Sequence, residues 1–389
     1  MVTVQTSWPL HRDTPVCTVR RLELGVPGQI MPPADAAVRF AQRSEAEGFD
    51  AVWWPDHLMG WHADTMWTPD LTPLAAVQPN PHTYFDPLIM MGVVGAQTER
   101  IKVGVVVTDL IRRNPAMAAA SALTLDHVTK GRAIIGLGSG EKLNVTPYGM
   151  SFEKPVAKLS EGIDVMRLLW ESDGPVDYAG QFHTLERAVL GLSPYGERPP
   201  EIWTAAHGPR MLRLTGEKAD GWLPTKMTAP DYGRALTTIA QSAQDAGRDP
   251  DRITPGMLGY VLMGPDEETV RRLTEAPLVR ALCVLLPSQV FRDLGVEPPL
   301  DGASGFHDFI PTTIERAESL RIIDAIPPEV VRHYAFCGTP EQVAEELAPY
   351  RENGLRHLVM WNITAFGDPS LTRWSYQAMT ELRSLLEQG

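Results

Sequence analysis

Short runs of β-branched and other apolar residues alternate with longer amphipathic segments along most of the chain, and this alternation is the strongest constraint on its fold. A strand followed by a helix predicts a βα unit whose strands lie parallel in one sheet. The pattern predicts eight strands: Arg21–Val26, Asp50–Trp54, Ile101–Val107, Arg132–Leu137, Glu201–Ala205, Gly221–Pro224, Gly256–Met263 and His357–Ile363. It also predicts helices between the first strands, at Ala34–Glu47, Phe85–Gln97 and Pro115–Val128.

Eight parallel strands in 389 residues favour an α/β fold of the (β/α)8 TIM-barrel type over an open, doubly wound sheet. No fixed-period repeat and no low-complexity linker divides residues 1–389, so we expect a single domain. Three segments are too long for plain loops and are interpreted as insertions after strands two, four and seven, at residues 58–84, 172–199 and 287–328. Because barrel active sites lie where strands end, the first insertion should overhang the site.

Composition excludes several classes of partner. The chain carries 35 Lys and Arg residues against 48 Asp and Glu residues, a formal charge of −13, which is the wrong sign for nucleic acid or an anionic membrane. No apolar run approaches the roughly 18 residues of a membrane span. Cys17, Cys283 and Cys337 are too far apart for a CxxC pair or a disulfide framework, and residues 1–21 lack a secretory signal. We therefore expect a cytoplasmic protein without a metal site.

Asp56 and His57 close the second predicted strand, in the sequence Trp54-Pro55-Asp56-His57. A catalytic group of a barrel would sit at this end of a strand, and histidine is the side chain best suited to proton transfer near neutral pH. The competing interpretation is a capping aspartate beside a surface histidine.

A glycine-rich turn follows the fourth predicted strand, from Gly136 to Glu141, with Asn144 three residues further on. Glycines let the backbone approach a ligand closely, although Glu141 stands where a dinucleotide fingerprint needs its third glycine. Glu141 is a second candidate for proton transfer, facing His57, or else an exposed turn carboxylate.

Residues 205–210 (AAHGPR) follow the fifth predicted strand and open a helix. Such a helix N-terminus with a nearby cation suits a phosphate, whereas the alternative is an ordinary cap with a solvated Arg210. Further basic residues near strands three and four are equally well explained as surface scatter: Arg112, Arg113, Lys130 and Arg132.

The first insertion is rich in apolar residues and contains no Lys or Arg between Leu58 and Tyr84. It is interpreted either as a lid that shields the site from water or as a dimer contact. The residues concerned are Trp61, Met66, Trp67, Leu71, Leu74, Val77 and Tyr84.

Several of these blocks together resemble the luciferase-like oxidoreductases, a TIM-barrel superfamily that uses FMN or the deazaflavin coenzyme F420. The resemblance is carried by residues 55–57 (PDH), 104–116 (GVVVTDLIRRNPA), 131–149 (GRAIIGLGSGEKLNVTPYG) and 200–222 (PEIWTAAHGPRMLRLTGEKADGW). The strand-end Asp-His and Gly-Glu-x-x-x-Asn are similar to the F420 branch. Within it the chain is most similar to phthiodiolone ketoreductases, and more distantly to F420-dependent glucose-6-phosphate dehydrogenases.

The resemblance implies roles for individual residues. His57 and Glu141 match the family's proposed proton-transfer pair, and Trp61 would wall the substrate side. The positions that match cofactor contacts are Asp56, Val106, Val107, Thr108, Ser139, Gly140, Asn144, Ala206, His207, Gly208, Arg210 and Met211. The positions that match sugar-phosphate contacts of the dehydrogenases are Thr225, Lys226 and Arg332. The family also commonly carries a cis peptide bond, which we predict between Val106 and Val107.

The sequence and the resemblance thus lead us to expect an F420-dependent enzyme that moves a hydride between the coenzyme's C5 and a carbonyl or alcohol carbon. His57 is the first candidate acid and Glu141 the alternate. The apolar insertion favours a hydrophobic small molecule over a sugar phosphate, and a homodimer is expected. The alternatives are an F420-dependent sugar-phosphate dehydrogenase, an FMN-dependent monooxygenase and a catalytically silent cofactor carrier.

Overall fold

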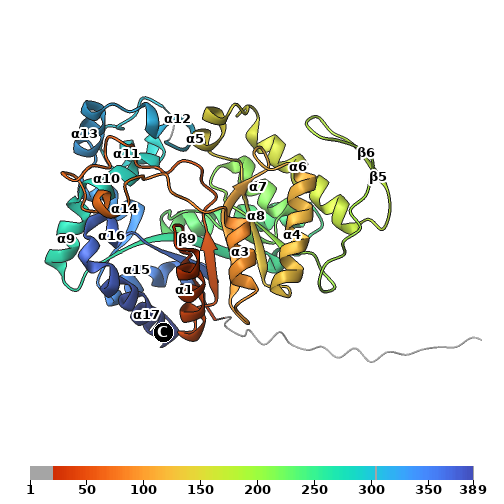
Figure 1. Ribbon diagram of the computed structural model, residues 1–389, viewed down its shortest axis with the longest axis horizontal. Coiled ribbons are helices and arrows are strands. Elements are labelled where there is room, and N and C mark those ends of the chain that lie inside the picture. The colour runs from red at the N-terminus through yellow and green to blue at the C-terminus, as the bar shows by residue number, and fades with distance from the viewer. Residues whose placement is uncertain (1–20, 303–304, 389) are drawn as a thin grey trace, which may run out of the picture.

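The computed structural model describes residues 21–302 and 305–388, with strands at its centre and helices around them (Figure 1). The strand pairings form a closed ring of eight parallel strands. The ring closes because β8 pairs with β9, β9 with β11 and β11 with β1. The eight strands are, in ring order, β1 (Glu23–Pro27), β2 (Ala51–Trp54), β3 (Lys102–Asp109), β4 (Ala133–Gly138), β7 (Glu201–Thr204), β8 (Gly221–Trp222), β9 (Thr254–Met263) and β11 (His357–Asn362). The predicted (β/α)8 barrel is confirmed.

A further strand, β10 (Ala335–Gly338), is absent from the prediction. It pairs in parallel with the second half of β9, from Tyr260 to Met263, whereas β8 pairs only with Thr254 and Pro255 at the start of β9. Four residues directly after a helix give too short a pattern to be recognised as a strand. In the folded protein, the edge of β9 supplies the hydrogen-bonding partners that keep these four residues extended.

Helices surround the barrel as an outer layer (Figure 1). The principal helices are α1 (Ala34–Ala46), α3 (Pro87–Gly95), α4 (Pro115–Thr129), α6 (Pro155–Glu171), α7 (Pro209–Lys218), α8 (Ala229–Asp245), α15 (Pro340–Glu352) and α17 (Thr372–Gln388). The side-chain oxygen atoms of Asp86 and Asn114 accept hydrogen bonds from backbone N–H groups in the first turns of α3 and α4. Among the described residues, no helix combines the length and apolar character needed to cross a membrane.

The three expected insertions differ in structure. The first contains only the short helix α2 (Leu74–Val77), and the second forms an antiparallel hairpin of β5 (Val176–Ala179) and β6 (Thr184–Ala188). The third lies on the opposite side of the molecule from the hairpin (Figure 1). The shorter helices of the fold are α5 (Lys142–Val145), α9 (Glu267–Glu275), α10 (Pro277–Leu282), α11 (Ser288–Asp293), α12 (Gly305–Asp308), α13 (Arg316–Asp324), α14 (Pro328–Tyr334) and α16 (Thr364–Gly367).

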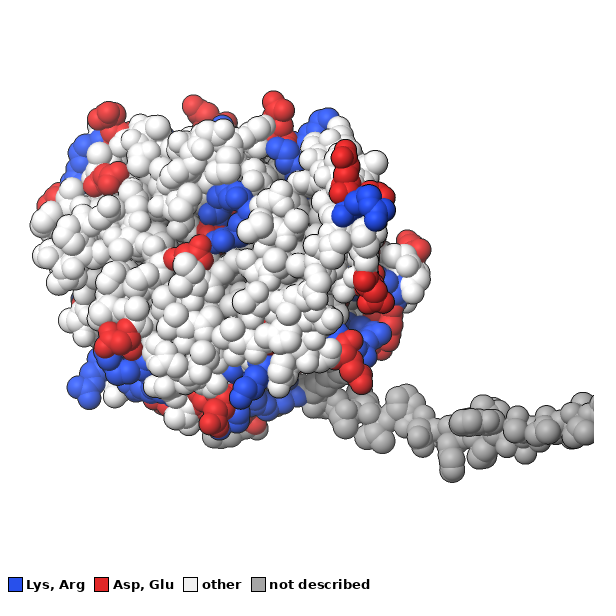
Figure 2. Space-filling view, turned by 45° about the vertical axis from the view of Figure 1, so that its right-hand side comes forward, with Lys and Arg blue, Asp and Glu red and all other residues white. Residues whose placement is uncertain are grey.

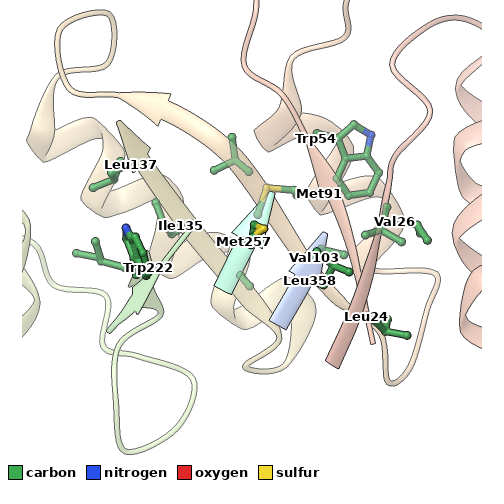
Figure 3. Packing of buried hydrophobic residues seen from close by; sticks show 14 of the residues in the cluster. Leu24, Val26, Trp54, Met91, Val103, Ile135, Leu137, Trp222, Met257 and Leu358 are labelled. Atoms are coloured by element: carbon green, nitrogen blue, oxygen red, sulfur yellow. The ribbon is translucent and has the colours of Figure 1, made fainter. Parts of the chain in front are cut away.

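Alternate residues of each strand face two different cores. Val52 and Trp54 of β2 pack outward against the helices, in the cluster seen in Figure 3, whereas Ala51 and Trp53 belong to a second cluster. Most of the face seen in Figure 2 is uncharged, with charged side chains gathered at its edges and one small mixed group in a hollow near its middle. Cys283 and Cys337 are buried free thiols, while Cys17 and the N-terminal segment lie outside the described residues.

Two tryptophans fill the second core, and glycines on neighbouring strands make room for them. A Cβ atom on Gly104 would lie 2.4 Å from the Trp53 ring, and one on Gly221 would lie 2.4 Å from the Trp203 ring. The Trp53 indole N–H donates to Nε2 of His357 at 3.1 Å, so the ring cannot easily move aside. The interior of this barrel therefore depends on matched large and small side chains.

We expect Gly104→Ala to lower the free energy of unfolding by about 1–3 kcal/mol, because the added methyl overpacks a filled core. Gly191→Ala is the control, since a Cβ atom there meets nothing within 4 Å. Thermal and urea unfolding of the two variants against the parent protein measure the difference. Equal stability of the two variants would contradict this account of the barrel interior.

Candidate active site

The ends of β2 and β4 bring the two predicted proton-transfer residues together. His57 follows β2 by three residues, Glu141 follows β4 by three residues, and His57 Nδ1 lies 3.6 Å from Glu141 Oε2. His57 is only 9% exposed, whereas the Glu141 side chain is 25% exposed. The competing interpretation of His57 as a surface residue is therefore wrong.

Aromatic rings enclose His57. The ring centroids of His57 and Trp61 are 4.7 Å apart in an edge-to-face arrangement, and those of His57 and Tyr84 are 5.4 Å apart. The buried Nε1 atom of Trp61 has no hydrogen-bond partner among the described residues. A buried donor without a partner is costly, so this N–H is suited to a ligand acceptor. Burial and the charge of Glu141 both raise the pKa of Tyr84 and keep its hydroxyl neutral.

Asp56, also at the end of β2, lies in a buried charge cluster. Its Oδ2 atom accepts from Thr108 Oγ1 at 2.5 Å and from Arg113 Nε at 2.9 Å, and Arg112 Nη1 lies 3.4 Å from its Oδ1. Burial raises the pKa of Asp56, but the neighbouring Arg112 and Arg113 guanidinium groups outweigh it and hold the pKa below its ordinary value. Asp56 is therefore a buried carboxylate rather than a helix cap.

Arg112 and Arg113 are not surface scatter, the interpretation that explained them equally well from the sequence. Arg112 also bonds to Asp109, and Arg113 Nη2 donates to Asp86 at 2.9 Å, so both guanidinium groups hold the ends of β2 and β3 together. The sequence signal for this ion-pair role is the presence of two adjacent arginines shortly after a strand that ends in Asp109. The peptide bond between Val106 and Val107 is cis, as predicted.

Close contacts surround the glycines at the end of β4 and directly after it. A Cβ atom on Gly136 would lie 2.0 Å from the carbonyl oxygen of Val105, and one on Gly138 would lie 2.7 Å from the Val107 side chain. Gly140 has φ +88°, a conformation that glycine adopts without strain. The turn that carries Ser139 and Gly140 thus requires glycines for its shape.

The N-terminus of α7 is open, as a phosphate site requires. Gly208 is its N-cap, no side chain caps the helix, and a Cβ atom on Gly208 would meet nothing within 4 Å. His207 Nε2 accepts from the backbone N–H of Thr225 at 3.1 Å, so the neutral ring carries its proton on Nδ1. Arg210 is exposed and forms no side-chain hydrogen bond or ion pair within the described ranges. Ala206 and Met211 beside them are buried.

Two of the three positions matched to sugar-phosphate contacts, Thr225 and Lys226, form hydrogen bonds within the protein. Lys226 Nζ donates to the carbonyl oxygens of Arg332 and Ala335 at 2.9 and 2.8 Å and to Glu346 Oε1 at 2.7 Å. These three bonds use every N–H of the ammonium group, which corrects the prediction of Lys226 as a substrate contact. Thr225 Oγ1 lies 2.9 Å from His207 Nε2.

Arg332 lies at a different surface. Its side chain is exposed on α14 and lines a surface hollow whose other charged residues are Asp266, Glu267, Glu268 and Arg271. Arg271 is already paired with Glu268 and Glu275, so the three carboxylates beside Arg332 disfavour a phosphate at this position. The structure therefore gives no support to Arg332 as a sugar-phosphate contact.

Comparison with known proteins identifies the family. Residues 16–357 match the family model described as luciferase-like monooxygenase. This chain belongs to the luciferase-like family. It is 36% identical over 348 residues to the phthiodiolone/phenolphthiodiolone dimycocerosates ketoreductase of Mycobacterium tuberculosis, covering 88% of this chain and 91% of the relative. The family resemblance drawn from the sequence is confirmed.

Two further proteins are similar to this chain. An F420-dependent glucose-6-phosphate dehydrogenase of Nakamurella multipartita is 29% identical over 363 residues, which cover 92% of this chain and 94% of the relative. The structure of an F420-dependent secondary alcohol dehydrogenase in complex with an F420-acetone adduct superposes with a TM-score of 0.72 at 20% identity, covering 94% of this chain and 99% of that one. The second comparison establishes the shared fold.

Asp56→Asn should lower the free energy of unfolding at pH 7 by about 1.5–3 kcal/mol, because two partly buried guanidinium groups lose a shared charged acceptor and keep only Asp109 and Asp86. The pKa of Asp56 is lower in the folded than in the unfolded protein, so its stabilisation is present above about pH 4 and is lost as the pH falls through the folded value. Unfolding measured from pH 7 down to pH 3 should therefore show the two proteins converging only in acid.

Asp35→Asn is the matched control, because Asp35 pairs with Arg39 on an exposed helix face. Its removal should change stability little at any pH. A constant difference between Asp56→Asn and the parent protein down to pH 3 would contradict the assignment of Asp56 as a buried ionised group.

Proposed function

We propose that this protein is an F420-dependent oxidoreductase that transfers a hydride between the coenzyme's C5 and a carbonyl or alcohol carbon. The observation that carries the proposal is the pair of proton-transfer side chains, His57 and Glu141, 3.6 Å apart at the C-terminal end of the barrel. The printed names of relatives that use F420 or reduce a ketone support the same chemistry.

The residues present fit a large anionic coenzyme. The uncapped N-terminus of α7 at Gly208 and the unpaired Arg210 suit a phosphate, and the glycines before and after Ser139 leave room for close approach. Ser139, Gly140, His207, Gly208, Arg210 and Met211 would hold the phosphate end, and Val106, Val107 and Thr108 would lie beside the ring. When bound, the deazaflavin supplies the redox chemistry as a hydride carrier.

The protein's own task is to manage the proton. When a ketone is reduced, its oxygen must gain a proton as the hydride arrives, and a positioned donor contributes about two to four orders of magnitude in rate. His57 or Glu141 supplies that proton, and the unpartnered N–H of Trp61 is placed to bind an oxygen beside His57. In alcohol oxidation the same groups accept the proton.

The first insertion supports an apolar substrate, although part of it serves packing. Met66 and Trp67 are buried, and the Thr65 hydroxyl donates to the carbonyl oxygen of Ile314 at 2.9 Å, which fixes this segment to the third insertion. It still carries no Lys or Arg near the site, and Lys226 is engaged elsewhere. We therefore favour a ketone or secondary alcohol on a hydrophobic molecule over a sugar phosphate.

Three features stay predictions: the choice of coenzyme, the homodimer and the cytoplasmic location. FMN remains the alternative coenzyme, because the family model is named for monooxygenases. A homodimer is supported by exposed apolar side chains on neighbouring helices α3 and α4, namely Ile89, Val93, Met117 and Val128. A cytoplasmic location likewise rests on the sequence.

Fluorescence titrations should give tight binding of F420 and weak binding of FMN. Arg210→Ala should weaken F420 binding by about 10- to 150-fold, because a charge-assisted contact to phosphate contributes roughly 1.5–3 kcal/mol, whereas Arg213→Ala on the same helix should not. His57→Ala should retain the coenzyme while turnover falls by about two to four orders of magnitude. Tight FMN binding without F420 binding would overturn the proposal.

Steady-state assays should show turnover of long-chain ketones or secondary alcohols and not of glucose-6-phosphate. Each methylene buried in an apolar groove contributes about 0.8 kcal/mol, so KM should fall as the chain lengthens. Efficient oxidation of glucose-6-phosphate, lost in Arg332→Ala, would instead establish the sugar-phosphate dehydrogenase alternative.

A further inference from the structure

Asn144, in the short helix α5, uses all of its hydrogen-bonding capacity inside the protein. Its Oδ1 atom accepts from the backbone N–H groups of Leu58 and Met59 at 2.8 and 3.0 Å. Its Nδ2 atom donates to His57 Nδ1 at 2.9 Å and to Glu141 Oε2 at 3.1 Å. An asparagine amide offers two acceptor and two donor positions, and all four are taken. The side chain is 1% exposed.

The two backbone contacts fix which way this amide points. The N–H groups of Leu58 and Met59 can only donate, so the oxygen of Asn144 must face them. The amide NH2 therefore faces His57 and Glu141. In this orientation His57 Nδ1 is an acceptor, and a neutral imidazole that accepts at Nδ1 carries its proton on Nε2.

Two other groups near Nδ1 can accept a hydrogen bond and would favour a proton on Nδ1, but both lie farther away than the Asn144 amide. The carbonyl oxygen of Met59 lies 3.2 Å away and the Glu141 carboxylate 3.6 Å away, both farther than the Asn144 amide. A proton on His57 Nδ1 would face a hydrogen atom of the Asn144 amide, so that two donors would oppose each other. The rings of Trp61 and Tyr84 that face His57 are uncharged, and the adjacent Asp56 is paired with arginines.

We propose that Asn144 is a positioning residue that holds His57 neutral with its proton on Nε2, and that its amide has no hydrogen bond left for the coenzyme. This inference rests on the proposed function for its catalytic meaning. A neutral His57 donates a hydrogen bond from Nε2 to the substrate oxygen and keeps its proton, in the way a neutral imidazole polarises a carbonyl. Delivery of the proton during ketone reduction then falls to the carboxyl group of Glu141.

The test is a nitrogen NMR measurement on the full chain labelled in its ten histidines, with His57→Gln to assign the signal. In the parent protein, without coenzyme, we expect a proton on His57 Nε2 and none on Nδ1. Asn144→Asp keeps an oxygen toward Leu58 and Met59 and replaces the NH2 by a charged acceptor, so a proton should appear on Nδ1. Asn353→Asp, which adds the same charge beyond the opposite end of the barrel strands, should leave the signal unchanged.

Coenzyme binding and the pH profile separate positioning from direct contact. Asn144→Asp should change F420 affinity less than about threefold while the pH profile of turnover moves to higher pH. A proton on Nδ1 in the parent protein would overturn the proposal even if the variant failed to fold. A loss of F420 affinity of tenfold or more with an unchanged His57 signal would also overturn it. If the parent protein bound no F420, the proposed function would fail while the NMR result still decided the role of Asn144.

Discussion

The buried pairing of Asp56 with Arg112 and Arg113 is the interaction on which the site depends. Asp56 follows β2, the arginines follow β3, and Arg113 also reaches Asp86 at the start of α3. An unpaired charge at this depth would be strongly destabilising, so the ends of the two strands cannot separate without loss of stability. His57, the next residue after Asp56, is thereby held in place.

A second link joins the ends of β2 and β4 through the neutral side-chain amide of Asn144. Asn144 binds the backbone of Leu58 and Met59 on one side and the His57 and Glu141 side chains on the other. All hydrogen-bonding positions of the Asn144 amide are occupied. This side chain after β4 thereby sets which nitrogen of His57, after β2, carries the proton. The site is thus preorganised before any ligand enters.

The insertions complete the enclosure. The Thr65 hydroxyl and the Arg316 side chain connect the first insertion to the third, and Trp67 packs edge-to-face against Phe366. These contacts make the apolar cover over the barrel part of the folded core rather than a loose flap. An enclosed site strengthens each hydrogen bond formed inside it, because water no longer competes.

The sequence by itself determined the eight barrel strands and placed Asp56, His57 and Glu141 at strand ends, because strand periodicity and turn chemistry are local. It could not determine that Arg112 and Arg113 are buried ion-pair partners. Nor could it reveal β10, the full occupation of Asn144 or the engagement of Lys226 with Glu346. Each of these depends on groups far apart in the chain, and only closure of the barrel brings such groups within hydrogen-bond distance.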